Sequence, residues 1–363
     1  MPKLKINKKI FSLKLSVTTY CLLRCQYCFV KKTNKMMDFS VAKKAISLLL
    51  SSPGKKKMLI IYGGEPLLNP FLKDIISTAK ALAKLFKKEL SISLATNGLL
   101  LSKENLNFFK RHNIKISISI DGNEDSHNQN RIFSNGLGSF NQVSEKLPLT
   151  FRLLKKQNIS AIMTVSSNLA QKMFDNFSYL IKKGFENIHL NPIQGKVWNE
   201  VQKEVFCNNL EKIMGYLVGG IENKEFVFLN CLNQLLAQKK RLEEVFKCPF
   251  YKCIEVYPQG EIAFSPFLMN LSSQERKRYI LGNIKRGFIK KYQNCYPDQN
   301  SSQCQNCWSD YYQKADSIKD SGTQLVNWRN QICQEVANYI YRQSQTKPIF
   351  KKYIKEAKKR IFE

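Results

Sequence analysis

Residues 11–28 read FSLKLSVTTYCLLRCQYC, in which an alternating segment runs directly into three closely spaced cysteines. Apolar and polar residues alternate over 11–17, a pattern that predicts a half-buried β-strand. Cys21, Cys25 and Cys28 then fall on the loop that follows this strand. Three thiolates on one short loop can bind one metal centre together.

The cysteine spacing favours an iron–sulfur cluster over a structural zinc ion. Bacterial ferredoxins space their ligands differently and supply a fourth cysteine, whereas the next cysteine in this chain is Cys207. Three ligands on a four-iron cluster leave one iron open, just as catalytic metal sites keep one position free. A structural zinc site needs a fourth Cys or His, and none is close in sequence. On spacing alone, zinc and chance clustering remain alternatives.

Strand and helix patterns alternate over the first half of the chain. The strand-like runs are 11–19, 58–62, 90–94, 114–120, 159–165 and 188–190. The helical patterns between them span 39–50, 69–87, 102–112, 139–156 and 169–183. Repeated strand–helix units predict an α/β fold with a parallel sheet and helical crossovers. Six units predict a partial (β/α)6 TIM-like barrel, and a doubly wound open sheet is the alternative that periodicity leaves open.

The pattern changes after residue 195. Helical patterns occupy 199–219, 229–246 and 323–363, and 254–264 is typical of a β-hairpin, because Pro258-Gln259-Gly260 supplies turn residues between two apolar runs. We therefore predict a core at 1–195, a helical bridge at 196–247, and a small C-terminal extension at 248–363.

Polar and glycine-rich motifs follow the predicted strands at their carboxyl ends. These motifs are Cys21–Cys28, Gly63–Pro66, Thr96–Gly98, Ser119–Gly122 and Leu190–Pro192. Parallel α/β folds place their functional sites at this edge of the sheet. Core packing does not explain five such motifs at one edge, so we expect them to form the site.

The spacing CX3CX2C, with Tyr27 before the last cysteine, resembles the radical S-adenosylmethionine (SAM) superfamily, and the resemblance covers about residues 11–195. It implies a partial barrel in which Cys21, Cys25 and Cys28 hold a [4Fe–4S] cluster, with SAM at the open iron. It also implies reductive cleavage of SAM to a 5′-deoxyadenosyl radical that abstracts a substrate hydrogen. The cofactor supplies this chemistry, and the protein positions the substrate.

Further motifs carry the same resemblance. Gly63-Gly64-Glu65-Pro66 resembles the GGE/P motif that holds the methionine amine of SAM, and Ser119-Ile120-Asp121-Gly122 with His127 and Arg131 resembles a second conserved stretch, with Asn128 where Asp is usual. Ser119 is implied to contact the ribose or carboxylate of SAM, and Arg131 a carboxylate. Asp121 is a polar contact or a turn cap. The cofactor-binding candidates are Tyr27, Gly63, Gly64, Glu65, Pro66, Asn97, Ser119, Asp121, Arg131 and Leu190. We assign no catalytic acid or base.

The C-terminal cysteines resemble the SPASM/twitch extension of radical SAM peptide-modifying enzymes. Gly260, the segment 281–284 (LGNI) and the pair Cys304/Cys307 match that pattern, but Ser265 and Gln313 stand where cysteines are usual. The resemblance implies one auxiliary cluster, and a zinc ion is the alternative. Its ligand candidates are Cys248, Cys253, Cys304 and Cys307, with Cys295 as a substitute.

The extension favours a peptide or protein substrate. Anaerobic sulfatase maturases resemble this architecture, but they carry Asp where this chain has Pro266, which disfavours sulfatase maturation. The alternatives are a radical SAM enzyme acting on a small metabolite or a tRNA nucleoside, and a non-enzymatic iron- or zinc-binding protein. A flavodoxin or ferredoxin is the implied electron donor.

The charge and composition of the chain limit which partners and which cellular location we expect. The 363 residues include 58 Lys or Arg and 28 Asp or Glu, a net charge of +30. This charge suits an acidic peptide, although Lys is abundant throughout the chain and a solvated basic surface is the simpler explanation. Nucleic acid is not favoured, because RNA-binding aromatic signatures are absent. No signal segment or long apolar run is visible, so we expect a cytoplasmic protein without a membrane partner.

Overall fold

The computed structural model describes residues 10–193, 198–238, 253–263, 268–269, 273–277, 279–289 and 321–362. The chain divides into two compact units. The first unit comprises 1–117, 132–136 and 248–300, and the second comprises 118–131, 137–247 and 301–363. These units interleave along the chain, so they do not test the predicted boundaries near 195 and 247, which stay a prediction.

The first unit is built on parallel strands with helical crossovers. Its elements in chain order are β1 (Ser12–Thr18), α1 (Phe39–Ser51), β2 (Lys56–Gly63), the 3-10 helix η1 (Pro66–Leu68), α2 (Leu72–Leu85), β3 (Glu89–Thr96), α3 (Lys103–His112), β8 (Cys253–Val256), β9 (Glu261–Ala263), α11 (Ser273–Arg276), β10 (Gly282–Asn283) and β11 (Gly287–Phe288). The strands follow the order β11-β10-β9-β8-β1-β2-β3. β1, β2 and β3 run parallel, as the sequence predicts.

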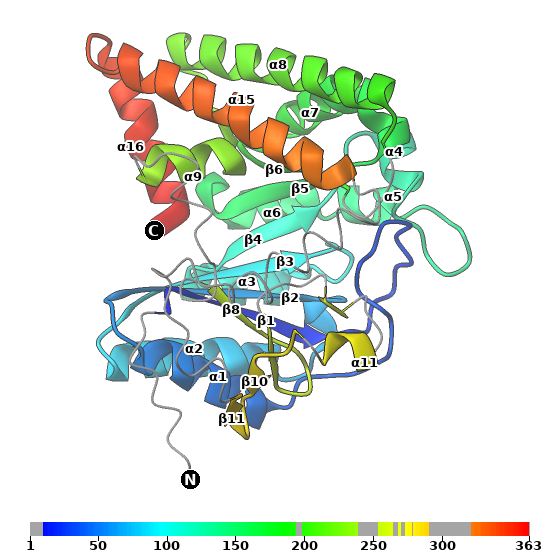
Figure 1. Cartoon of the computed structure of the whole chain (residues 1–363), viewed down its shortest axis with the longest axis vertical. Helices are drawn as coiled ribbons and strands as arrows, with labels where there is room; N and C mark the ends of the chain where they lie inside the picture. Colours follow the sequence, from blue (N-terminus) through cyan, green and yellow to red (C-terminus); the bar gives the residue numbers. More distant parts are fainter. Residues whose placement is uncertain are drawn as a thin grey trace. The chain divides into compact units, whose positions relative to one another are not determined.

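One face of this sheet carries the apolar core. Leu13, Leu15 and Val17 alternate along β1 with polar residues and are fully buried. Helices α1 and α2 lie side by side against the sheet (Figure 1) and bury an apolar stripe that includes Ile46 on α1. The helix predicted at 69–87 spans Leu72–Leu85, and Phe86, which follows its last residue, is 37% exposed.

The hairpin predicted at 254–264 forms as β8 and β9, which pair antiparallel. It does not stand apart from the first unit, because β8 pairs parallel with β1, Lys14 opposite Glu255. The helical pattern predicted at 323–363 is confirmed as two helices, α15 (Ser321–Gln343) and α16 (Pro348–Phe362). The segment 290–320, which holds Cys295, Cys304 and Cys307, lies outside the described residues, so the cluster-binding part of the extension stays a prediction.

The second unit combines two principal strands with long helices. Its elements are α4 (Glu124–Asn128), α5 (Phe140–Ser144), α6 (Leu147–Leu153), the 3-10 helix η2 (Lys156–Asn158), β5 (Ile159–Val165), the 3-10 helix η3 (Ser167–Lys172), α7 (Met173–Lys182), β6 (Asn187–Pro192), α8 (Glu200–Glu222), β7 (Phe228–Leu229), α9 (Asn230–Gln238), α15 (Ser321–Gln343) and α16 (Pro348–Phe362). β5, β6 and β7 pair parallel in that order. Helix α8 packs against α7 and α15, and α9 packs against α15 and α16 (Figure 1). The strand β4 (Lys115–Ser119) spans the division between the units.

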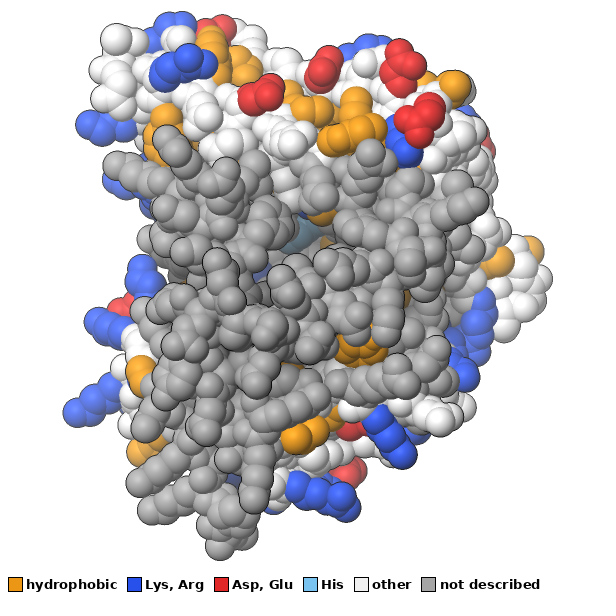
Figure 2. Space-filling model, in the orientation of Figure 1, with side chains coloured by type: hydrophobic (Ala, Val, Ile, Leu, Met, Phe, Trp, Pro, Cys, Tyr) orange, Lys and Arg blue, Asp and Glu red, His pale blue; other side chains and the backbone are white. Residues whose placement is uncertain are grey.

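The predicted α/β fold with a parallel sheet is confirmed. All six predicted strands of the first half of the chain form as β1 to β6. Among the described residues, no helix is both long and apolar enough to cross a membrane. Figure 2 shows Lys and Arg side chains dispersed over the described part of one face, with Asp and Glu side chains between some of them.

Candidate functional site

The cysteine loop begins where β1 ends. Cys21 is buried at 5% exposure, whereas Cys25 and Cys28 are partly exposed. The backbone N–H of Cys28 donates to the carbonyl oxygen of Cys25 at 3.0 Å, which closes a turn between these two thiols. The loop therefore carries all three sulfurs within one tight segment at the carboxyl end of the strand.

Nitrogen donors point at two of these sulfurs. The Sγ of Cys21 accepts from the backbone N–H of Leu23 at 3.4 Å and from Nδ2 of Asn97 at 3.7 Å. The Nζ of Lys32 lies 3.0 Å from the Sγ of Cys28. Burial raises the pKa of the Cys21 thiol, and the Leu23 N–H and the Lys32 charge oppose that rise. Hydrogen bonds to sulfur stabilise thiolates and tune iron–sulfur clusters.

Two glycines fix the loop to the strand that follows. The N–H of Gly64 donates to the carbonyl oxygen of Thr18 at 2.7 Å, and that of Glu65 donates to the carbonyl oxygen of Tyr20 at 2.8 Å. A Cβ at Gly64 would lie 2.1 Å from this Tyr20 oxygen, and Gly63 adopts a φ of 144°. Only glycine permits this approach, so Gly63 and Gly64 hold the backbone that leads into Cys21.

The Glu65 carboxylate joins the ends of β2 and β3. One oxygen accepts from the N–H of Leu67 at 3.1 Å and the hydroxyl of Thr96 at 2.8 Å, and the other accepts from the N–H of Asn97 at 2.7 Å. The side chain is fully buried, and burial raises the pKa of Glu65 to about 7 against the opposing effect of these hydrogen bonds. Thr96 and Leu67 were not predicted as its partners, since nothing in their local sequence points to Glu65.

A second backbone segment holds the loop from another direction. The N–H of Arg24 donates to the carbonyl oxygen of Ile132 at 2.7 Å, and Leu23 forms an antiparallel bridge with Phe133. The guanidinium of Arg24 donates to the carbonyl oxygen of Cys21 at 2.7 Å. No sequence motif predicted this pairing.

In the second unit, Asp121 and Arg131 form a buried ion pair. The guanidinium donates through Nε at 3.0 Å and Nη2 at 2.9 Å to the two carboxylate oxygens. Oδ1 of Asp121 also accepts from the N–H of Thr164 at 2.9 Å. Asp121 is 2% exposed and Arg131 5% exposed. This paired geometry ties the segment after β4 to β5, which accounts for both side chains without a ligand.

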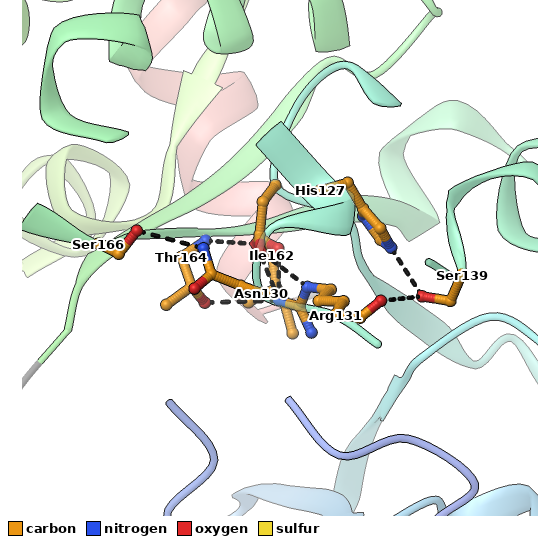
Figure 3. A network of polar contacts seen from close by, with 8 residues as sticks. His127, Asn130, Arg131, Ser139, Ile162, Thr164 and Ser166 are labelled. Atoms are coloured by element: carbon orange, nitrogen blue, oxygen red, sulfur yellow. Dashed lines mark hydrogen bonds and ion pairs between the residues drawn. The ribbon is translucent and has the colours of Figure 1, made fainter. Parts of the chain in front are cut away.

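The residues around this pair form one polar network (Figure 3). Nε2 of His127 lies 3.0 Å from the hydroxyl of Ser139, which donates to the carbonyl oxygen of Arg131 at 2.8 Å. The side chain of Asn130 donates to the hydroxyl of Ser166 at 3.2 Å. Burial lowers the pKa of His127 to about 4, and the Arg131 charge adds to this shift. Asn128, which stands where the family pattern has Asp, accepts from the N–H of Phe140 at 3.0 Å.

The other candidates occupy strand ends and loops. Ser119 and Tyr27 are partly exposed, and Pro66 opens η1. Leu190 is buried on β6, and its carbonyl oxygen accepts from Arg329 of α15 at 2.8 Å, a contact that no motif predicted. Cys253 begins β8. Cys248, Cys295, Cys304 and Cys307, together with Ser265 and Pro266, lie outside the described residues.

The donor set of the loop suits an iron–sulfur cluster. Within the part of the chain that the structure describes, no group of three His, Cys, Asp or Glu side chains is arranged around a single metal ion. A cubane makes a different demand, because each thiolate binds a different iron. The loop supplies three thiols, one for each of three irons, and nitrogen donors at the sulfurs of Cys21 and Cys28 would stabilise their thiolates.

Comparisons with known proteins agree with this geometry. Residues 15–166 match the model of the radical SAM superfamily. A cysteine-type anaerobic sulfatase-maturating enzyme from Clostridium novyi (strain NT) is 22% identical over 80% of this chain and 86% of its own length. A GTP 3′,8-cyclase from Staphylococcus epidermidis is 32% identical over 34% of this chain and 37% of its own length. The fold resembles native anSMEcpe with bound AdoMet and Cp18Cys peptide, with a TM-score of 0.65 at 18% identity over 89% of this chain and 99% of the other. Residues 15–166 therefore form a domain of the radical SAM superfamily, and the chain that carries this domain is an enzyme.

Proposed function

We propose that Cys21, Cys25 and Cys28 hold the [4Fe–4S] cluster that this superfamily uses, with one iron open to SAM. The observation that supports this is the loop itself, whose sulfurs receive N–H groups from Leu23, Asn97 and Lys32 at the carboxyl edge of the sheet. When bound, the cluster supplies the electron that cleaves SAM. The chain's own residues orient SAM, position the substrate and exclude water.

For SAM binding, Gly63 and Gly64 offer backbone groups, and Glu65 acts by holding that backbone in place. The Glu65 carboxylate already accepts three hydrogen bonds from Leu67, Thr96 and Asn97. We assign Asp121 and Arg131 a comparable positioning role, because they neutralise each other. Tyr27, Pro66, Asn97, Ser119 and Leu190 remain our candidates for direct contact with SAM.

A residue in a peptide or protein is our proposed substrate. The alignment with the sulfatase-maturating enzyme spans 80% of this chain and continues past the radical SAM domain, whereas the alignment with the GTP cyclase covers only 34%. The similarity that continues beyond the radical SAM domain is therefore to the sulfatase-maturating enzyme, a relative that modifies a peptide residue, and this favours a peptide substrate. Abstraction of a hydrogen atom from the peptide residue would start its modification.

An auxiliary metal site would extend this function. Cys248, Cys253, Cys304 and Cys307 are the proposed ligands, with Cys295 as a substitute. Its role would be to bind the peptide or to take up the electron released on product formation. A flavodoxin or ferredoxin is the proposed donor, and the need to keep these thiols reduced suits a cytoplasmic location. An acidic peptide would complement the charge of +30.

The first experiment tests the cluster and the cleavage of SAM. The full-length chain is reconstituted anaerobically with iron and sulfide, reduced with dithionite and given SAM. We expect 5′-deoxyadenosine from the wild type, none from Cys28→Ala, and a wild-type yield from Cys207→Ala, whose cysteine lies outside the motif. Equal yields from Cys28→Ala and Cys207→Ala would refute the cluster assignment.

The second experiment separates the substrate classes. The reconstituted enzyme is offered peptides with a central Cys or Ser, precursor-like acidic peptides, and GTP, and each is examined by mass spectrometry. We expect conversion of a precursor-like acidic peptide. We expect no conversion of the peptide with a central Cys, which resembles a sulfatase, since Pro266 replaces the Asp of the maturases. Conversion of GTP alone would overturn the peptide proposal while leaving the radical SAM assignment intact.

A further inference from the structure

Two cysteines outside the proposed cluster sites meet between two helices. The thiol of Cys333 on α15 lies 2.9 Å from the Sγ of Cys231 on α9, although the two are 102 residues apart in sequence. Neither cysteine belongs to a cysteine motif of the sequence. A disulfide S–S bond is about 2.05 Å long, so less than about 1 Å of approach separates these sulfurs from a bond.

The two thiols have unequal surroundings. Cys333 is fully buried, whereas Cys231 is partly exposed. The hydrogen bond from Cys333 lowers the pKa of Cys231, and the nearby charge of Arg329 adds to the effect. The same hydrogen bond, together with burial, raises the pKa of Cys333. Cys231 is therefore the cysteine of the pair that more readily becomes a nucleophilic thiolate.

We propose that Cys231 and Cys333 form a redox-active dithiol that closes to a disulfide joining α9 to α15. The oxidant is a small-molecule disulfide. The Cys231 thiolate attacks one of its sulfurs, forms a mixed disulfide and releases the first small thiolate. The Cys333 sulfur then gives up its proton and attacks the Sγ of Cys231, which forms the protein disulfide and releases the second small thiol. Two protein thiols are oxidised, and one small disulfide is reduced to two thiols.

The bond would act on a helix that contacts a strand end in the same unit. Arg329 lies one turn before Cys333 on α15 and donates to the carbonyl oxygen of Leu190 at 2.8 Å and to the side chain of Asn191 at 3.3 Å. A covalent link from Cys333 to α9 would restrain this turn of α15. The oxidation state of the pair would thereby set how firmly Arg329 is held at the carboxyl end of β6.

The competing explanation is simple packing, because buried thiols often act as small apolar side chains. The reconstituted full-length enzyme is incubated anaerobically with oxidised glutathione, alkylated and digested, and its peptides are analysed by mass spectrometry. We expect a linked peptide pair containing Cys231 and Cys333, lost on treatment with dithiothreitol, with iron content unchanged. Absence of this pair, or its appearance only after iron is lost, would overturn the proposal.

Single variants test the order of the steps. Cys333→Ser should retain glutathione on Cys231, because the sulfur that displaces it is missing. Cys231→Ser should leave Cys333 unmodified, and Cys207→Ser should form the linked pair as the wild type does. Glutathione on Cys333 in the Cys231→Ser variant, at the extent seen on Cys231 in the Cys333→Ser variant, would contradict the assigned roles.

Discussion

The Glu65 carboxylate accepts a hydrogen bond from the backbone N–H of Asn97 at 2.7 Å, and this bond joins the segment after β2 to the end of β3. The same Asn97 directs its side chain at the Sγ of Cys21. One buried carboxylate thereby connects the GGEP motif to the cysteine loop.

Replacement of Glu65 by Ala should weaken this whole edge of the sheet. The change leaves the N–H of Asn97 and the hydroxyl of Thr96 without their acceptor, and each unsatisfied buried group costs about 1–3 kcal/mol. We expect a lower free energy of unfolding in urea, less iron per chain after reconstitution, and weaker SAM binding. Thr96→Val removes two hydrogen bonds, the one to Glu65 and the one from the N–H of Gly98, but leaves the bond between Glu65 and Asn97, and should cost about 1 kcal/mol for each bond lost. Wild-type iron content in Glu65→Ala would contradict the connection.

Gly64→Ala should disrupt the cysteine loop. The added Cβ would meet the carbonyl oxygen of Tyr20 at 2.1 Å, and backbone must move to relieve the clash. We expect reduced iron content and SAM cleavage. Gly215→Ala on α8 is the matched control, because a Cβ there meets nothing within 4 Å and should stabilise the helix by about 0.5–1 kcal/mol. Equal activity in the two variants would mean that the close approach at Gly64 is not needed.

Arg131→Ala should be strongly destabilising. It leaves the Asp121 carboxylate buried without its ion-pair partner, and breaking such a pair costs about 3–5 kcal/mol. Unfolding in urea measures the loss. The double variant Asp121→Asn/Arg131→Ala should recover part of it, because the uncompensated charge is removed. Additive losses in the double variant would show that the two side chains act independently.

His127 should make the protein sensitive to mild acid. Its pKa falls from 6.5 to about 4 in the folded state, so the unfolded chain binds more protons between these values. The contribution of neutral His127 to stability is full above pH 6.5 and is lost as the pH drops toward 4, by up to about 3 kcal/mol. His127→Gln should reduce the slope of the unfolding free energy against pH in this range, and His189, whose pKa burial also lowers to about 4, should continue to contribute. The same slope in variant and wild type would exclude His127 as its source.

Local sequence predicted the elements well where their pattern is continuous. The run 159–165 matches β5 at both ends, and its side chains alternate between buried and half-buried along the strand, although Ala161, Ile162 and Met163 are three apolar residues in succession. The helix predicted at 139–156 was wrong as a single element, since it is broken into α5 and α6. Pro148 lies in the first turn of α6 and lacks the N–H that a continuous helix would need.

The site was predictable only in part. The positions of the Cys21 loop, Gly64 and Glu65 were predictable, because each directly follows a strand that the local sequence pattern predicts. The partners of these residues could not be predicted in the same way. Ile132 contacts the Cys21 loop, and Arg329 contacts β6. Both contacts join residues far apart in sequence, and local periodicity does not predict which distant residues will meet.

The pairing of β8 with β1 bears on how the protein is made. β1 is synthesised more than 200 residues before β8, so one of its edges has no strand partner until Cys253 to Val256 have been made. An unpaired edge strand invites association with other chains, and contacts between distant residues form slowly. The nascent chain therefore carries an open strand edge from the synthesis of β1 to that of β8, and a truncation upstream of β8 would leave this edge permanently unpaired.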